Sequence, residues 1–304
     1  MKPIEIIKLI IRIALGGMFI TTAILKLLSI DEFELYIYSF ELFDYVLVTV
    51  FSRLVIAFEF LMGVGLIAKI RYKYVWWLTM LMMIGFTFFL TYVAIFRNDS
   101  NCHCFGDFVE LNPLHSIFKN LITILFLLFV YKENDYEFRF KKLVTALAFA
   151  VALIVPFIVV PMDALYNKIK SPFKEVNIEA FEEMKQDSTM QAFNVEEGNH
   201  IVAFFISKCQ FCKLGIKKVH SVVERNELDQ DKIKIIISGD EEHIKQFKEE
   251  SNTESYNYFT ISPFISMGVM YGSFPTFLYV TDGKVVKAGD LRSLEEKDIV
   301  EFLQ

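Results

Sequence analysis

The chain has 304 residues, of which 54% are hydrophobic, and its formal net charge is −6. Its mean hydropathy of +0.40 is too high for an ordinary soluble protein of this length, so the composition excludes a purely soluble protein and predicts one that sits in a lipid bilayer. The charge is mild and no basic patch is interleaved with aromatic residues, so nucleic acid is not an expected partner.

The apolar residues are unevenly distributed along the chain. Residues 1–162 are dominated by runs of Ile, Leu, Phe, Val and Met, whereas the composition from Asp163 onward is that of a soluble protein. This division predicts two domains. We expect a transmembrane domain at residues 1–162, a polar linker at residues 163–177 and a soluble domain at residues 178–304.

Five segments of the first domain are long and apolar enough to cross a bilayer. They are Ile6–Leu28, Val46–Ala68, Tyr74–Phe96, Pro113–Tyr131 and Leu143–Met162. Lys and Arg gather at the segment ends that share a side with the N-terminus, whereas the opposite loops, Ser29–Tyr45 and Arg97–Asn112, contain only Arg97. Because cytoplasmic loops are enriched in basic residues, we expect a bacterial inner-membrane protein with a cytoplasmic N-terminus and an extracytoplasmic C-terminal domain.

The four cysteines form two close pairs. Cys102 and Cys104 lie in "NCHCFGD", between the third and fourth predicted spans, and Cys209 and Cys212 lie in "SKCQFCK". The predicted topology places both pairs in the same oxidising compartment. A disulfide that closes so short a loop constrains the unfolded chain little, so the pairs indicate redox or metal chemistry rather than static cross-links.

The second pair lies where a strand gives way to a helix. "HIVAFFIS" has the pattern of a strand and "CKLGIKKVHSVVERN" has helical spacing, so Cys209 opens the helix. Free N–H groups and the helix dipole stabilise a thiolate there, and Lys208 acts in the same direction, which makes Cys209 the expected nucleophile. Cys212, one turn later, is the expected resolving thiol. A zinc site is the alternative, but no second C-x-x-C or His pair in this domain completes four ligands.

The pattern of strand, C-x-x-C, helix, strand and helix, followed by "SFPTFLYVTDGKVV", resembles a thioredoxin-fold domain over Ile178–Gln304. The resemblance implies an α/β fold with a cis-proline that faces the dithiol, and Pro275 in "FPTF" matches that proline. Lys208 replaces the aromatic residue usual in the family, and Ala203 replaces the buried acid of thioredoxin itself. These departures argue against a general reducing thioredoxin and leave the dithiol assignment intact.

The helices around "NCHCFGD" resemble a second family. "MFITTAILKL", "FEFLMGVGL" and "CHCFGD...LNPLHSIFKN" are similar to the DoxX-like membrane bundle, and most of all to the methylamine utilisation protein MauE branch, in which C-x-C-F-G precedes a helix in the same way. The similarity covers Ile6–Tyr131. It implies an all-α bundle of about five helices with a role in disulfide formation or redox maturation outside the membrane. The loop must bend for Cys102 and Cys104 to form a disulfide.

Charged residues inside the predicted spans indicate a polar pocket near this loop. They are Lys26, Arg53, Glu59, His115 and Lys119. Ionisable groups at membrane depth usually face a bundle interior, so Glu59 should be neutral or paired with a cation. Lys26, Arg53 and Lys119 could alternatively extend to the membrane interface. Together the cations could stabilise a thiolate in the loop or polarise the carbonyl of a quinone, the candidate cofactor; none is expected to be bound covalently.

These patterns favour a membrane thiol-disulfide oxidoreductase. Cys209 and Cys212 would exchange with thiols and disulfides of exported proteins, and electrons would pass to or from Cys102 and Cys104. The alternative is a metal-handling protein in which Cys102, His103 and Cys104 bind a soft ion such as Cu(I) and the thioredoxin-like domain is a carrier or reductant. A third hypothesis is that the bundle only anchors the soluble domain.

Overall fold

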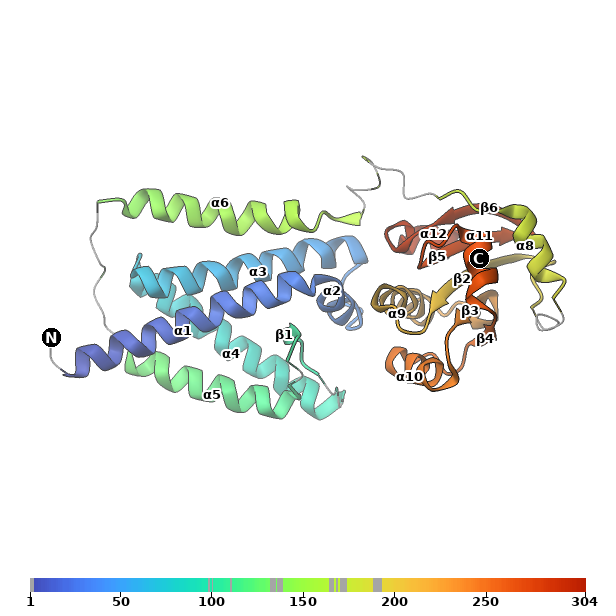
Figure 1. Cartoon of the computed structure of the whole chain (residues 1–304). Helices are drawn as coiled ribbons and strands as arrows, with labels where there is room; N and C mark the ends of the chain where they lie inside the picture. Colours follow the sequence, from blue (N-terminus) through green and yellow to red (C-terminus); the bar gives the residue numbers. More distant parts are fainter. Residues whose placement is uncertain are drawn as a thin grey trace. The chain divides into compact units, whose positions relative to one another are not determined.

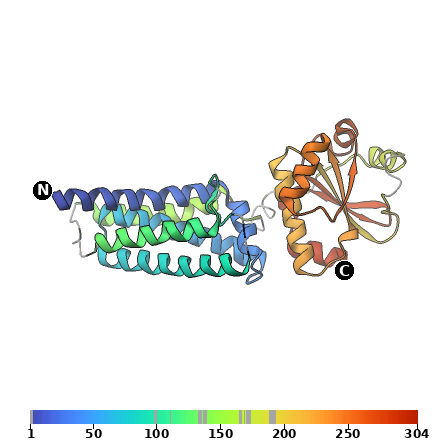
Figure 2. The ribbon, with the colours of Figure 1, turned by 90° about the horizontal axis from the view of Figure 1, so that it is seen from below.

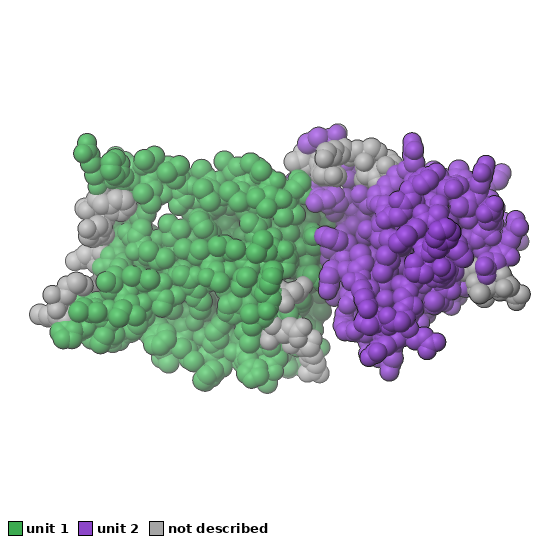
Figure 3. Space-filling view, viewed as in Figure 1, with its two compact units in different colours: residues 1–161 green, residues 162–304 purple. Residues whose placement is uncertain are grey.

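The structure, a computed structural model, describes residues 3–97, 99, 101–109, 111–131, 135, 139–163, 167, 169, 174–187 and 193–304. The chain divides into two compact units, Met1–Pro161 and Met162–Gln304 (Figure 1, Figure 3). Of the predicted linker, residues 164–166, 168 and 170–173 lie outside the described residues. Each unit has its own fold.

The first unit is a bundle of long helices that lie side by side (Figure 1, Figure 2). Its elements are α1 (Pro3–Leu28), α2 (Ile30–Tyr38), α3 (Tyr45–Ala68), α4 (Tyr72–Phe96), β1 (Cys104–Asp107), α5 (Pro113–Phe129) and α6 (Lys141–Val159). Among the described residues, α1, α3, α4 and α6 are long and apolar enough to cross a membrane. The apolar helix α5 has 17 residues, at the lower limit for a span. The predicted all-α membrane bundle is confirmed, and the protein is a multi-pass membrane protein.

The short helix α2 lies within the segment that the sequence pattern treats as an outer loop. Its nine residues bury Ile30, Phe33 and Tyr38, and it packs against α3. Periodicity over so few residues does not separate a helix from a loop, so the sequence carried little signal for it. This omission affects the site, because α2 supplies the partner of Arg53.

Two glycines bring α1 and α3 together. A Cβ atom added to Gly63 would lie 2.7 Å from the carbonyl oxygen of Gly16, and one added to Gly16 would lie 2.7 Å from that of Gly63. Small residues let helix backbones approach closely within a bilayer, where association depends on packing. The contact holds α1, which carries Lys26, against α3, which carries Glu59.

The second unit is built on a five-stranded mixed sheet. Its principal elements are α8 (Ile178–Lys185), β2 (Asn199–Ile206), α9 (Gln210–Arg225), β3 (Ile233–Ser238), α10 (Glu241–Ser251), β4 (Asn257–Thr260), α11 (Pro263–Met270), β5 (Thr276–Thr281), β6 (Lys284–Gly289) and α12 (Glu296–Leu303). The strand order is β4-β3-β2-β5-β6. β2, β3 and β4 run parallel, and β5 pairs antiparallel with both β2 and β6. This is the predicted thioredoxin-like fold.

Successive side chains of β2 point to opposite faces of the sheet, and large apolar side chains of β2 are buried on both faces. Phe204 packs in a core with Phe181 of α8 and Val269 of α11. On the opposite face, the ring of Phe205 lies 5.6 Å from that of Phe247 in α10. β2 is therefore held firmly from both sides, and the cysteine pair follows its end.

The end of β2 and the start of β5 lie at the same edge of the sheet. In their antiparallel pairing, Phe204 is opposite Thr276. Cys209 lies just beyond β2 and Pro275 just before β5, so the fold brings both to this edge.

Candidate functional site

Cys209 is the N-cap residue of α9. Its backbone is extended (φ −85°, ψ 117°), and its Sγ accepts a hydrogen bond of 3.3 Å from the backbone N–H of Cys212. Cys212 is fully buried, whereas Cys209 is partly exposed. The thiol at the helix terminus is thus the one that a substrate can reach.

The two thiols of this pair differ strongly in acidity. A hydrogen bond from the Cys212 thiol, together with the backbone N–H groups of Cys212 and Phe211, lowers the pKa of Cys209 to about 6. Burial, together with the hydrogen bond to Cys209, raises the pKa of Cys212 well above its ordinary value. At neutral pH, Cys209 is therefore a thiolate and Cys212 keeps its proton.

Lys208 and Pro275 are the other residues that the sequence pattern associates with this dithiol. The exposed Lys208 Nζ lies 3.9 Å from the carboxylate of Asp240, so its charge is shared with that acid. Hydrogen bonds, not this lysine, account for the low pKa of Cys209. The peptide bond between Phe274 and Pro275 is cis, as the thioredoxin resemblance implies.

The C-x-C loop bends at its central residue. His103 has a left-handed backbone conformation (φ +52°), which His tolerates better than most residues. The side-chain oxygen of Asn101 accepts a hydrogen bond of 3.1 Å from the backbone N–H of His103, and Cys102 N–H donates to Leu111 O at 2.9 Å. The bend places the backbone N–H of Cys104 3.4 Å from Cys102 Sγ.

Cys102 lies against the first turn of α5. Its Sγ is 2.9 Å from Oγ of the buried Ser116. A hydrogen bond from the Cys104 thiol lowers the pKa of Cys102 to about 6, with help from the Ser116 hydroxyl, the Cys104 backbone N–H and the charge of Lys119. The hydrogen bond to Cys102, together with burial, raises the pKa of Cys104. The loop thus repeats the pairing of one thiolate with one protonated thiol.

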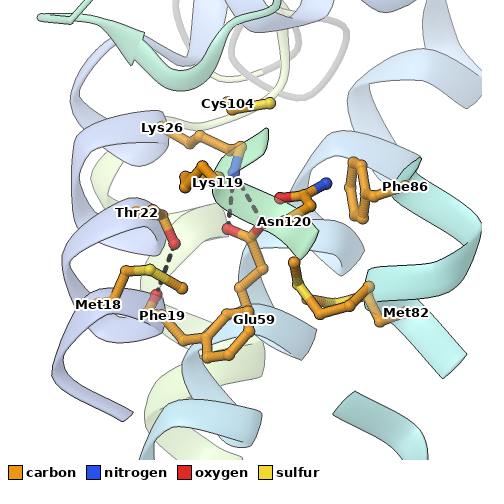
Figure 4. A pocket seen from close by; sticks show the side chains of 11 residues that line it. Met18, Phe19, Thr22, Lys26, Glu59, Met82, Phe86, Cys104, Lys119 and Asn120 are labelled. Atoms are coloured by element: carbon orange, nitrogen blue, oxygen red, sulfur yellow. Dashed lines mark hydrogen bonds and ion pairs between the residues drawn. The ribbon is translucent and has the colours of Figure 1, made fainter. Parts of the chain in front are cut away.

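A small cavity of about 30 Å³, lined by both charged and apolar side chains, lies next to Cys104 (Figure 4). Lys26 Nζ contacts both carboxylate oxygens of Glu59, at 2.7 and 2.8 Å, and both side chains are buried. Lys119 and Asn120 of α5 line the same cavity. The space is large enough for about one water molecule. Buried charges and a water-sized space therefore adjoin the loop thiol.

Three of the five residues predicted to form the polar pocket share this cavity: Lys26, Glu59 and Lys119. Glu59 is paired with a cation, which is one of its two expected states. Lys26 is only 2% exposed, so its side chain lies inside the bundle and not on its surface.

Arg53 and His115 lie elsewhere, which corrects the prediction that all five residues form one pocket. Arg53 pairs with Glu34 of α2 and donates to Val160 O at 2.8 Å, so it joins α3 to α2 and to the end of α6. His115 is exposed. Consecutive helix residues point about 100° apart, so Ser116 rather than His115 faces the loop.

Sequence reasoning missed Ser116 and Glu34 as partners of site residues. Ser116 lies 14 residues from Cys102 in the chain, and no spacing rule joins a loop cysteine to a helical serine. One signal was available: the "NP" of "LNPLHS" marks a helix start, with Asn112 as N-cap and Pro113 in the first turn. That start places Ser116 in the first turn, close to the preceding loop.

The arrangement of the loop bears on the metal-handling alternative. Within the part of the chain that the structure describes, no group of three or more His, Cys, Asp and Glu side chains is arranged to hold a metal ion. The His103 ring packs on Tyr36, with ring centroids 4.7 Å apart.

Comparison with known proteins gives a family match to the first part of the chain. Residues 4–132 match the family model described as "Methylamine utilisation protein MauE". This part of the chain is a MauE domain. The MauE domain contains α1 to α5 and the C-x-C loop, and α6 follows it.

Two further proteins are similar to this chain, one over most of its length and the other over about a third of it. Protein TlpB of Flavobacterium psychrophilum is 23% identical over an alignment 331 positions long, which covers 91% of this chain and 89% of that protein. A secreted Mycobacterium tuberculosis disulfide oxidoreductase homologous to E. coli DsbE is 11% identical, with a TM-score of 0.29, and covers 36% of this chain and 82% of its own. The similarity to TlpB extends over the MauE domain and the thioredoxin-like unit together.

Proposed function

We propose that this protein is a thiol-disulfide oxidoreductase of the bacterial inner membrane that passes electron pairs between its two dithiols. Cys209 and Cys212 would exchange with thiols and disulfides of exported proteins, and Cys102 and Cys104 would reset them. The Lys and Arg distribution of the loops supports a cytoplasmic N-terminus, with both dithiols on the extracytoplasmic side.

The observation that carries this proposal is the matched acidity of the two pairs. In each pair one thiol has a pKa of about 6, at Cys102 and Cys209. Its partner, Cys104 or Cys212, has a raised pKa. A thiolate beside a protonated thiol is the state from which a dithiol attacks a disulfide and then resolves the mixed disulfide. A static cross-link requires no such asymmetry.

The exchange steps balance without any further reagent. When a client dithiol is oxidised, a client thiolate attacks Cys209 of the Cys209–Cys212 disulfide, and a mixed disulfide forms. The second client thiolate then displaces Cys209, which leaves readily because its pKa is low. The reduced Cys209 then attacks the disulfide of the loop pair, and Cys212 resolves this second mixed disulfide. Reduction of clients uses the same steps in reverse.

The steady-state redox form of the C-terminal pair tests the proposal. We expect the separate variants Cys102→Ser and Cys104→Ser, in cell membranes, to shift Cys209 and Cys212 almost entirely into one redox form, measured by alkylation with a mass-adding maleimide. We expect a nearly complete shift because, without the loop dithiol, only the client proteins exchange electrons with Cys209 and Cys212 and so set their redox form. Phe108→Ala, a change at an exposed residue just after β1, is the matched control and should keep the wild-type form. An unchanged redox form in both cysteine variants would refute the proposal.

A further inference from the structure

A second and larger cavity, of about 400 Å³, also adjoins the loop cysteines. It lies between α2, α3, α4 and the loop, and both Cys102 and Cys104 line it. Its volume is within the range of ~300–1,000 Å³ that is typical of small-molecule and cofactor sites. A molecule bound there would contact the loop thiols directly.

The lining of this cavity is apolar and rich in aromatic side chains. Phe33, Phe86 and Phe89 are among the rings that form it. Apart from the two cysteines, the polar side chains in the described lining are Lys26, Tyr36 and His103. An apolar wall with a few polar groups is the composition expected of a site for a flat, weakly polar ligand.

The rim of the cavity favours entry from the bilayer. Phe43 and Phe51 belong to the lining and are 39% and 44% exposed, and α3 and α4 are membrane-spanning helices. An apolar rim on a membrane bundle admits a lipid-soluble molecule and disfavours the polar backbone of a client protein. The occupant should therefore be lipid-soluble.

We propose that this cavity binds the ring of a lipid-soluble quinone, which oxidises the Cys102–Cys104 dithiol. This inference rests on the proposed function and gives it a direction, from client thiols to the membrane. The Cys102 thiolate and the Cys104 thiol together lose two electrons and one proton as the S–S bond forms. The quinone gains those two electrons, the Cys104 proton and one proton from water, and becomes a quinol.

The smaller cavity beside Glu59 fits this proton balance. Lys26, Phe86 and Cys104 line both cavities, so the thiol that gives up its proton lies between the apolar site and the water-sized space beside Glu59. A lipid acyl chain would fill the apolar cavity equally well. It would neither accept electrons nor require a proton source, so the paired cavities and the dithiol in their shared wall favour a quinone.

Quinol formation by the full chain tests the site directly. We would use protein in phospholipid nanodiscs under anaerobic conditions, with Cys209→Ser and Cys212→Ser so that only the loop dithiol reacts. Decylubiquinone is the probe. We expect one quinol formed for each Cys102–Cys104 dithiol oxidised. Oxidation of the same dithiol by glutathione disulfide is the reference reaction. A variant whose loop is misfolded would change the rate of this reaction as well as the rate with quinone.

A matched pair of glycine variants locates the site. Gly85 lines the large cavity and Gly17 does not, and a Cβ atom at either position meets open space. Gly85→Leu should lower the ratio of quinone rate to glutathione rate on the order of tenfold by occupying the ligand's space, while Gly17→Leu should keep the wild-type ratio.

Two results would overturn the quinone site. One is a wild-type protein that reacts with glutathione disulfide but forms no quinol, which would indicate a lipid-filled cavity and leave the exchange between dithiols untouched. The other is a Gly85→Leu variant with the wild-type ratio. Failure of the exchange proposal is seen separately, in an unchanged redox form of Cys209 and Cys212 in the loop variants.

Discussion

Gly106 packs directly against Ser29, at the end of α1. A Cβ atom at position 106 would overlap Ser29 Oγ and lie 2.9 Å from Leu25 O, and the Gly106 backbone is left-handed (φ +63°). Only glycine combines that conformation with so close an approach. The contact fixes the cysteine loop onto the helix that carries Lys26, which explains physically why a glycine ends the C-x-C-F-G element.

Gly106→Ala should displace the loop and change the chemistry of its thiols. Because Cys102 would lose its alignment with Ser116 and Cys104, we expect its pKa to rise, as measured by the pH dependence of its alkylation. Gly198→Ala is the matched control: Gly198 is also left-handed (φ +80°) but has open space around its Cβ position. Both changes should cost about 1 kcal/mol from backbone strain, but only Gly106→Ala should alter Cys102. Equal alkylation profiles in the two variants would show that the contact with Ser29 does not position the loop.

The alkylation of Cys209 should follow an unusually acidic titration. In a Cys102→Ser/Cys104→Ser variant, the rate with iodoacetamide should be half-maximal near pH 6, because the reactive thiolate predominates above the lowered pKa of Cys209. Cys212→Ala should move the midpoint upward, since the hydrogen bond from Cys212 is the largest cause of the low pKa. A midpoint near the ordinary thiol value of about 8.5 in the first variant would contradict this account of the nucleophile.

The Lys26–Glu59 pair should show the energetics of a buried ion pair. Lys26→Met leaves the Glu59 carboxylate buried without its partner, so we expect a loss of about 3–5 kcal/mol in the free energy of unfolding. Lys26→Met combined with Glu59→Gln removes both charges and should recover most of that loss. Thermal unfolding in detergent, followed by exposure of buried cysteines, measures both. A double variant no more stable than the single one would mean that the pair has another stabilising role.

A labelling experiment tests whether both cysteine pairs lie on the extracytoplasmic side of the membrane. In whole cells with a permeabilised outer layer, a membrane-impermeant thiol reagent applied after reduction should label Cys209 and at least one of Cys102 and Cys104. The expectation follows from the few basic residues in the loops on that side. Labelling that occurs only in broken membranes would refute the shared compartment.

The elements that depend on local pattern were the predictable ones. The five apolar segments reach the length that a span requires, and the strand before Cys209 and the helix after it follow from hydrophobic spacing. A cation beside Glu59 was one of the two expected arrangements, because a carboxylate so far from the interface must be neutralised or paired. The identity of that partner, Lys26, depends on the glycine contact between α1 and α3, which periodicity alone does not reveal.

The parts that escaped prediction depend on tertiary contacts. Arg53 was assigned to the pocket because it lies at the right depth in its helix, but its acid partner, Glu34, comes from α2, whose helical pattern is too short to recognise. His115 and Ser116 are adjacent in sequence, and the rotation of α5 decides which of them faces Cys102. Packing sets that rotation. The position of a residue along its helix was therefore predictable from the sequence, but the direction in which its side chain points was not.

The central claim, that the two dithiols exchange with each other, is tested most directly by trapping their mixed disulfide. In Cys212→Ser combined with either Cys104→Ser or Cys102→Ser, one thiol of each pair remains, so a disulfide formed between these two thiols on mild oxidation with diamide cannot be resolved by a neighbouring thiol. With a protease site inserted between the units, cleavage should leave the two fragments joined in non-reducing gels and separated in reducing ones, in at least one of the two variants. Fragments that separate without reductant in both variants, in membranes where Cys209 still forms mixed disulfides with clients, would contradict the account.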